Sequence, residues 1–188
     1  MRCSARKLCL SAAFAAGLAG SVHVPADAQT RNPRAAASAP AKAAFDPNRI
    51  VTKVSQADLV AIVRQGGHTV VSEKEFGDVS VLARTSDGVL FLLIGRVCDL
   101  PDYGPGCLGL EYQVRYDADS RVTLDNINTA NQSYSATKVY QGPNEEGKDT
   151  VYVTHYVILD GGQRMENLAT ILINVLDIAP KASQVIWP

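Results

Sequence analysis

The sequence predicts an α+β fold in which helices pack on an antiparallel sheet. Apolar residues recur at helical spacing near residues 55–67 and again from residue 165, whereas most of the chain between these segments alternates apolar with polar residues as strands do. The predicted strands come in runs and do not alternate with helices, which favours antiparallel pairing. The predicted order of elements is α-β-β-β-β-α-β-β-α.

The first predicted helix covers residues 55–67, SQADLVAIVRQGG. Ser55 is a suitable N-cap, and Asp58 stands at the acidic position of a capping box. After this helix the apolar period changes to two, which is typical of strands. Strands are expected at residues 68–72, 79–84, 89–97 and 108–116.

Two of these strands are expected to differ in burial. Asp87-Gly88 is a hairpin signal, and it leads into residues 89–97, which are almost wholly apolar. That stretch is therefore expected to be a central strand buried on both faces. Residues 108–116 alternate apolar with polar side chains, so one face of that strand is expected to meet the core and the other to meet water.

The second half of the chain predicts a short helix, two strands and a final helix. The short helix lies within residues 117–133, and Thr123 is its expected N-cap. The two strands are expected at residues 135–142 and 150–160. The final helix runs from Met165 to about Ile178, and Pro180 is expected to end it because proline interrupts helical hydrogen bonding.

Residues 1–28 have the pattern of a secretory signal peptide. Arg2, Arg6 and Lys7 precede an apolar run, and Ala26-Asp27-Ala28 forms a cleavage site. An uncleaved membrane anchor at the N-terminus is the alternative. Cleavage predicts a periplasmic or secreted bacterial protein.

The rest of the chain is expected to be a disordered Ala/Pro-rich linker at residues 29–48, followed by one domain at residues 49–188. No segment after the signal is expected to be long and apolar enough to span a bilayer. The whole chain has a net charge of −1 and residues 1–28 have a net charge of +2, so the remaining chain carries −3. A mildly acidic chain gives no electrostatic reason to expect nucleic acid or an anionic membrane as partner.

Cys98 and Cys107 bracket a loop that is rich in proline and glycine. An even number of cysteines in an exported chain favours a disulfide, so the pair is expected to tie the ends of two adjacent strands. Free or regulatory thiols and a metal site are the alternatives. A structural metal site usually takes four ligands at short spacings, whereas these two cysteines stand nine positions apart.

Four other residues are candidates for binding. Asn128 and Asn131 share a face of the predicted short helix. A tie to the neighbouring strand is expected for them, and recognition of a polar ligand is the alternative. Tyr152 and Tyr156 lie on one face of their strand, opposite His155, where the final helix is expected to cover them unless a partner does so. His155 is expected to pack against the core with one hydrogen bond.

Four segments resemble the YbjN-domain family, which are small bacterial proteins often labelled sensory transduction regulators. The segments are INTAN (127–131), TKVYQG (137–142), TVYVTHYVILDGG (150–162) and the closing amphipathic helix. The resemblance covers the chain from Ser55 to the C-terminus and implies a fold like that of type III secretion chaperones. The chain departs from the family pattern at Ala130, where an aromatic residue is common, and at Gln132, where a basic residue often stands. The family brings no catalytic residues to carry over.

We therefore expect an exported, non-enzymatic module that binds another polypeptide, with chaperone-like or regulatory behaviour and with no metal or other cofactor. It could also form a homodimer. The alternative is an envelope sensor or accessory protein that binds a small ligand between sheet and helix. A hydrolase that uses His155 ranks third, since the sequence holds no G-x-S-x-G, P-loop or H-E-x-x-H motif.

Overall fold

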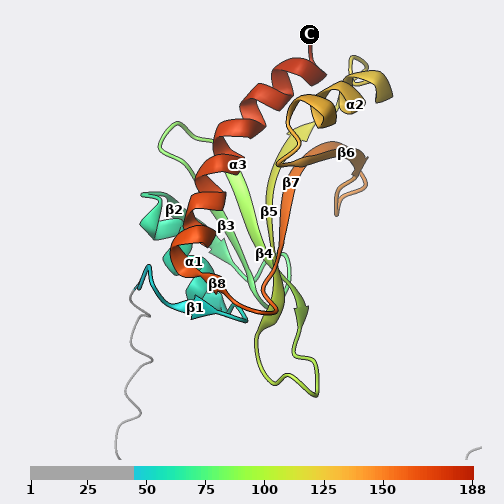
Figure 1. Ribbon diagram of the computed structural model, residues 1–188. Coiled ribbons are helices and arrows are strands. Elements are labelled where there is room, and N and C mark those ends of the chain that lie inside the picture. Colours follow the sequence, from blue (N-terminus) through green and yellow to red (C-terminus); the bar gives the residue numbers. More distant parts are fainter. Residues whose placement is uncertain (1–44) are drawn as a thin grey trace, which may run out of the picture. The chain divides into compact units, whose positions relative to one another are not determined.

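The computed structural model describes residues 45–188, and these residues confirm the predicted α+β fold (Figure 1). The helices are α1 (Gln56–Gln65), α2 (Leu124–Ser133) and α3 (Met165–Ile186). Six strands form one antiparallel sheet in the order β2-β3-β4-β5-β7-β6. Their bounds are Thr69–Glu73 for β2, Ser80–Arg84 for β3, Leu90–Cys98 for β4, Cys107–Asp117 for β5, Lys138–Pro143 for β6 and Asp149–Ile158 for β7.

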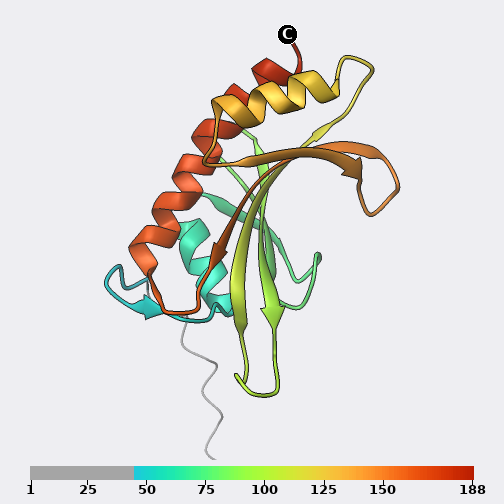
Figure 2. The ribbon, with the colours of Figure 1, turned by 45° about the vertical axis from the view of Figure 1, so that its right-hand side comes forward.

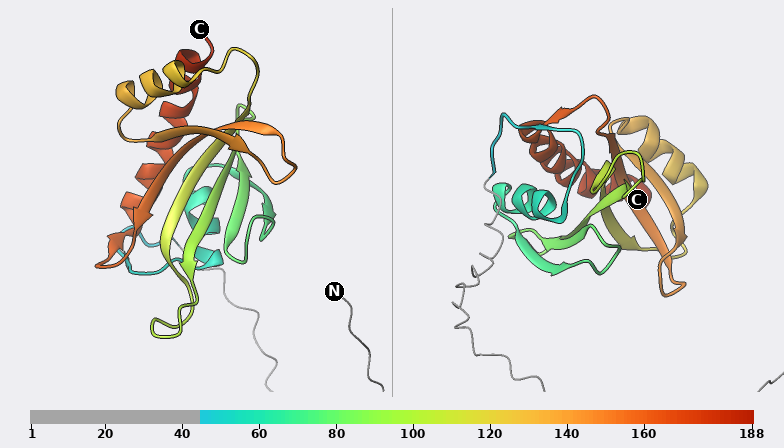
Figure 3. Two further views of the ribbon diagram at one scale, coloured as in Figure 1. Left: turned by 90° about the vertical axis from the view of Figure 1, so that its right-hand side faces the viewer. Right: turned by 90° about the horizontal axis from the view of Figure 1, so that it is seen from below.

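Helices α1 and α3 lie on one face of this sheet. Figure 1 shows both helices on the same side of the strands, and the left view of Figure 3 shows the strands in front of them. The core lies between the two layers, where Leu59 and Ile62 of α1 and Leu168 and Leu172 of α3 are buried. Tyr112 of β5 links the layers, because its hydroxyl donates to the C=O of Leu168 at 2.8 Å.

Strand β4 is central in the sheet, as predicted. Leu93 pairs with Tyr112 and so faces the helices together with Phe91, whereas Leu92 and Ile94 point to the opposite face. These four residues of β4 are buried, whereas Leu90 and Val97 at the ends of the strand are exposed. The continuous apolar run therefore corresponds to burial on both faces, as is usual for central strands.

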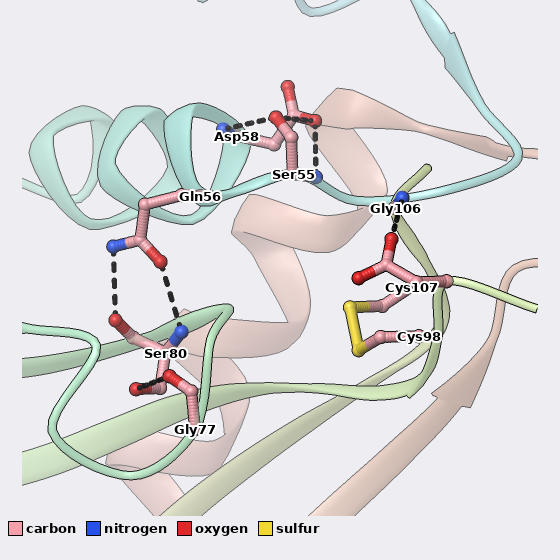
Figure 4. Close-up of a disulfide and its surroundings, with 9 residues drawn as sticks. Ser55, Gln56, Asp58, Gly77, Ser80, Cys98, Gly106 and Cys107 are labelled. Atoms are coloured by element: carbon pink, nitrogen blue, oxygen red, sulfur yellow. Dashed lines mark hydrogen bonds between the residues drawn. A yellow bond between two sulfur atoms is a disulfide. The ribbon is translucent and has the colours of Figure 1, made fainter. Parts of the chain in front are cut away.

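Two polar contacts fix the start of α1 (Figure 4). The predicted capping box is confirmed, since the Ser55 side chain accepts from the Asp58 N–H and the Asp58 carboxylate accepts from the Ser55 N–H. Gln56 Nε2 donates to the C=O of Ser80, and the Ser80 N–H donates to Gln56 Oε1, both at 3.0 Å. We call such an arrangement, in which one side-chain amide bonds the N–H and the C=O of one strand residue, a carboxamide clamp. It joins α1 to the first residue of β3.

Helix α2 lies beside the C-terminal end of α3 (Figure 2). Thr123 caps α2 as predicted, because its hydroxyl accepts from the N–H of Asn126. The Asn126 side chain donates to the C=O of Ile186 at 3.1 Å. This bond ties the start of α2 to the end of α3.

Helix α3 is longer than expected, and the prediction that Pro180 ends it is wrong. The helix continues to Ile186 with Pro180 inside it. Proline removes one helical hydrogen bond, but Ala179, Ala182 and Ile186 are buried, and their packing holds the last turns in the helix. The expectation about membrane spans also needs correction, since α3 is long and apolar enough by length and composition to cross a bilayer. Its apolar stripe packs in the core of the domain.

A two-stranded sheet, which the sequence did not predict, lies at the other end of α3. Strand β1 (Ile50–Val51) pairs with β8 (Gln163–Arg164). Each strand has only two residues, so no alternation of apolar and polar residues is visible in the sequence. The short pairing holds the start of the domain against the N-terminus of α3.

The predicted signal peptide at residues 1–28 and the first part of the predicted linker, residues 29–44, lie outside the described residues. The last four linker residues, 45–48, lie against the domain. Phe45 is partly buried against the core, and the C=O of Pro47 accepts from the N–H of Glu166 at 3.1 Å. Residues 45–48, which the sequence assigns to the linker, therefore contact the domain.

Replacing Tyr112 by Phe tests the hydrogen bond between the two layers. Burial raises the pKa of the Tyr112 phenol above its ordinary value. The folded state therefore holds this proton more tightly than the unfolded state, so the stability from Tyr112 is complete below the ordinary pKa of about 10 and is lost as the pH rises above it. We expect Tyr112→Phe to lower the free energy of unfolding at neutral pH by about 1 kcal/mol and to weaken its decline at alkaline pH.

Urea unfolding at neutral and alkaline pH measures both effects. Some alkaline decline should remain, because burial also raises the pKa of Tyr116 and of Tyr140. Tyr103→Phe, at an exposed tyrosine, is the control and should change the free energy of unfolding by less than about 0.5 kcal/mol. Equal effects of the two substitutions would contradict the role given to Tyr112.

Candidate functional site

The face of the sheet opposite α1 and α3, which we call the uncovered face, carries Tyr152, Thr154 and Tyr156 of β7. The expectation that the final helix covers these residues is wrong. The helix-facing Tyr112 of β5 pairs with His155, so the neighbours of His155 along β7 point away from the helices. The right view of Figure 3 shows α1 and α3 together on one side of the sheet. Tyr156, which is 47% exposed, therefore lies where a partner can approach, whereas Tyr152 is buried by its neighbours on this face.

A ladder of polar side chains runs along the middle of the uncovered face. Arg96 of β4 donates to Glu111 of β5 at 2.6 Å, and Gln113 donates to the other oxygen of Glu111 at 3.3 Å. Arg115 then donates to the side-chain oxygen of Gln113 at 2.5 Å. Arg115 also forms a two-pronged ion pair with Glu145, from the loop between β6 and β7, at 2.7 and 2.9 Å. The two arginines and two glutamates thus neutralise each other within the ladder.

The ion pair between Arg115 and Glu145 holds the end of the ladder in place. Hydrogen bonds from Arg115 are the largest cause that lowers the pKa of Glu145 below its ordinary value. The pair therefore stays ionised throughout the neutral range. Since the Glu145 side chain is 58% exposed, water screens the pair and its contribution to stability is small.

Aromatic rings border the ladder. Tyr140 of β6 stacks on Tyr152 of β7, with 4.9 Å between ring centroids and 13° between ring planes. The hydroxyl of Tyr152 donates to the C=O of Pro143 at 3.0 Å, and the residue is only 6% exposed. The guanidinium carbon of Arg115 lies 4.8 Å from the ring centre of Phe76 and 5.4 Å from that of Tyr152. Tyr152 is therefore fixed in the face by its neighbours.

Tyr156 and Ile158 are exposed apolar residues of the uncovered face, at 47% and 64% exposure. The Tyr156 ring lies on Gly109 of β5, where an added β-carbon would come within 2.1 Å of the tyrosine hydroxyl oxygen. Glycine at this position makes room for the ring. Tyrosine beside an aliphatic residue is the kind of surface that is enriched at the centres of protein interfaces.

Asn128 and Asn131 both line a groove of about 540 Å³ between α2 and β6, but only one of them is held by the fold. Asn131 makes a second carboxamide clamp, in which its Nδ2 donates to the C=O of Val139 at 2.9 Å and its Oδ1 accepts from the Val139 N–H at 2.7 Å. This clamp ties α2 to the edge strand β6. Asn128 is exposed, and its side chain has no hydrogen-bond partner among residues 45–188.

Cys98 and Cys107 form a disulfide at the end of the β4–β5 hairpin, where they are direct partners in the register (Figure 4). Cys107 is buried, and its backbone exchanges two hydrogen bonds with Val54, both at 2.9 Å. Val54 directly precedes Ser55, the N-cap of α1. The bridge therefore supports the hairpin where it meets the start of the first helix.

His155 lies at the margin of the core on the helix-facing side of β7. Its Nδ1 is 2.6 Å from the C=O of Ala136, and its ring centroid is 6.3 Å from that of Tyr112. These contacts fit a packed histidine with one hydrogen bond. Within residues 45–188, no group of three or more His, Cys, Asp or Glu side chains is placed to hold a metal ion.

Sequence reasoning missed the polar ladder of the uncovered face. The alternation in β5 does assign Glu111, Gln113 and Arg115 to the wet face, so part of the signal was present. The contacts to Arg96 and Glu145 depend on the register of β4 and on the position of the β6–β7 loop. Neither can be read from the pattern of one strand.

Replacing Asn131 by Ala removes both hydrogen bonds of the clamp on Val139. We expect the free energy of unfolding to fall by about 1–3 kcal/mol, because a backbone N–H and C=O lose their partners under α2. Asn128→Ala is the matched control in the same helix and should change it by less than about 0.5 kcal/mol. Urea unfolding measures both, and equal losses at the two positions would show that Asn131 has no special structural role.

Removing the disulfide should lower stability without changing the fold. The double variant Cys98→Ser, Cys107→Ser is expected to lose about 2.5–3 kcal/mol of unfolding free energy, since the unfolded chain is no longer restricted by the ring. Reductant should destabilise the unmodified protein by the same amount and leave the double variant unchanged. Mass spectrometry of the protein isolated from the cells that make it provides a second check, and two free thiols at these positions would contradict the structural bridge.

The chain matches no family model, and no curated protein matches it significantly. Among solved structures it is similar to YbjN from E. coli, described as "a putative transcription regulator". The match has a TM-score of 0.54 and 12% sequence identity, and it covers 74% of this chain and 93% of the YbjN chain. This likeness shows a YbjN-like fold, which agrees with the fold that the sequence resemblance implied.

Proposed function

We propose that this protein is an exported, non-enzymatic module that binds another polypeptide on the uncovered face of its sheet, with chaperone-like or regulatory behaviour. We also propose that it is a distant relative of the YbjN-domain family. The observation that carries the function is the uncovered face itself. One side of a six-stranded sheet is buried under helices, and the other presents fixed tyrosines, an internally neutralised ladder and the exposed Tyr156 and Ile158.

The chemistry of this face favours a polypeptide as partner. The ladder balances its own charges, so the face does not select a strongly charged ligand. Tyr156 and Ile158 can bury apolar side chains of a partner, while the tyrosine hydroxyl and the half-exposed Arg96 offer hydrogen bonds at the margin. Tyrosine and arginine are among the residues enriched where binding energy concentrates at protein interfaces.

Export is supported by two features of the chain. Residues 1–28 have the charged start, apolar run and cleavage site of a secretory signal. The Cys98–Cys107 disulfide is a form of cross-link that persists in oxidising compartments such as the periplasm or the cell exterior. We therefore propose that the mature protein begins at Gln29 and is periplasmic or secreted.

An envelope sensor or accessory protein that binds a small ligand is the second candidate function. The groove between α2 and β6 favours it, because its volume of about 540 Å³ falls in the range of small-molecule sites. A thermal shift with one metabolite or metal ion, absent with others, would distinguish this function from polypeptide binding.

Replacing Tyr156 by Ala together with Ile158 by Ser tests the uncovered face. The partner is first captured by crosslinking the mature protein in the cell envelope, identified by mass spectrometry and purified. We expect the double variant to bind the purified partner at least about tenfold more weakly, because it loses the exposed apolar contact. Isothermal titration calorimetry measures the affinity.

Ile173→Ser is the matched control, since Ile173 is 56% exposed but lies on α3. It should keep the affinity and change the free energy of unfolding by less than about 0.5 kcal/mol. The double variant also loses the contact of the Tyr156 ring with Gly109, and urea unfolding should show that it remains folded under the conditions of the binding assay. An unchanged affinity in the double variant, or an equal loss in Ile173→Ser, would overturn the proposed face. Self-crosslinks alone would assign the face to a second copy of this chain and would contradict a different polypeptide as partner.

A further inference from the structure

The edge strand β6 presents two residues whose backbone groups point away from the sheet. In an antiparallel ladder, every second residue turns its N–H and C=O outward from the neighbouring strand. Val139 is one such residue, because its N–H and C=O bond the side chain of Asn131 on α2. Gln141 stands two positions further along β6 in the same register. Its N–H and C=O therefore point to the same side as those of Val139.

Elsewhere in the fold, a side-chain carboxamide bonds both the N–H and the C=O of a single strand residue. The Asn131 side chain accepts from the N–H of Val139 at 2.7 Å and donates to its C=O at 2.9 Å. Gln56 bonds the N–H and the C=O of Ser80, both at 3.0 Å, and this C=O also accepts from the N–H of Lys74 at 2.9 Å. A primary carboxamide suits this position because it carries a donor and an acceptor on adjacent atoms, as a neighbouring strand would.

The outward N–H and C=O of Gln141 have no carboxamide partner among residues 45–188. Gln141 lines the groove between α2 and β6, which gives its backbone groups an open approach. Beyond it, Pro143 has no N–H, and its C=O already accepts from the hydroxyl of Tyr152. With Asn131 on one side and Pro143 on the other, a whole strand cannot add to this edge. The free site is one residue long.

The walls of the groove combine apolar and polar groups around this free pair. Leu124 is 71% exposed, and together with Ile127 it supplies the apolar wall. Asn128, whose side chain is exposed, adds a further donor and acceptor. The acidic residue Asp149 also lines the groove. The groove therefore suits an uncharged polar group with an apolar stem and disfavours an anion.

We propose that this groove binds the primary carboxamide of a Gln or Asn side chain carried by a polypeptide. The ligand NH₂ donates to the C=O of Gln141, and its carbonyl oxygen accepts from the Gln141 N–H. The apolar stem of the side chain and the flanking residues pack on Leu124 and Ile127. A carboxylate in place of the carboxamide cannot donate, and Asp149 repels it. The groove is a different surface from the uncovered face and shares with the proposed function only the polypeptide nature of the partner.

Nuclear magnetic resonance of the ¹⁵N-labelled mature protein tests this site with two probes, acetyl-Leu-Gln-Leu-amide and acetyl-Leu-Glu-Leu-amide. We expect the glutamine peptide to shift the amide signals of Gln141, Gly142 and Asn128 in a saturable way. The glutamate peptide should bind at least about tenfold more weakly, which corresponds to about 1.4 kcal/mol.

Two substitutions at Gln141 form a matched pair. Gln141→Pro removes the outward N–H, at an edge position where proline does not interrupt the β6–β7 ladder, and should abolish the shifts at Gly142 and Asn128. Gln141→Ala keeps the backbone pair and should keep the shifts. Leu124→Asp is a second test that does not depend on the proline variant. It changes an exposed side chain and should therefore preserve the fold. It should weaken binding of the glutamine peptide at least about fivefold.

Three results would overturn the proposed carboxamide site. They are the absence of shifts with the glutamine peptide, shifts of equal size with both peptides, and shifts that survive Gln141→Pro. Shifts confined to Tyr156 and Ile158 would assign the peptide to the uncovered face, which would support the proposed function and reject the groove. If only the carboxamide site in the groove fails its test, the affinity test at the uncovered face still decides the proposed function independently.

Discussion

Burial of one face of the sheet under α1 and α3 is the constraint on which the rest of this structure depends. It gathers the apolar side of β5 and β7 around Tyr112 and leaves the other side without a helix. That other side still contains the buried Leu92 and Ile94 of β4. The long polar side chains on the same side must therefore be held in fixed positions. The ladder from Arg96 to Glu145 and the stacked tyrosines serve this purpose, and they leave Tyr156 and Ile158 open to contact.

The helices also complete the hydrogen bonding of the strands through carboxamides. The side chain of Gln56 on α1 bonds the N–H and C=O of Ser80, and the side chain of Asn131 on α2 bonds those of Val139 on the edge strand. Open strand edges invite uncontrolled pairing with other chains, and here Asn131 and Pro143 restrict the β6 edge to the single residue Gln141. A restricted edge of this kind can recognise one side chain and avoids the addition of a whole strand.

Local patterns predicted the elements well, because capping and alternation are properties of neighbouring residues. The caps at Ser55 and Thr123 and the doubly buried β4 follow from such patterns. The expectations that failed depended on distant contacts. Packing of Ile186 carries α3 past Pro180, and the register of β7 places Tyr156 away from the helices. Asn128 and Asn131 share a helix face as predicted, but only the position of β6 decides that one is bonded and the other is free to face the groove.

Site-specific photo-crosslinking in the cells that make the protein tests the central claim most directly. A photoreactive phenylalanine analogue is placed at position 156 on the uncovered face or at position 173 on the helical side, and the adducts of the protein are identified by mass spectrometry. If the uncovered face binds a polypeptide, one defined polypeptide should crosslink from position 156 and be absent from position 173. Adducts of that polypeptide from position 173 alone, or the same adducts from both positions, would contradict the claim.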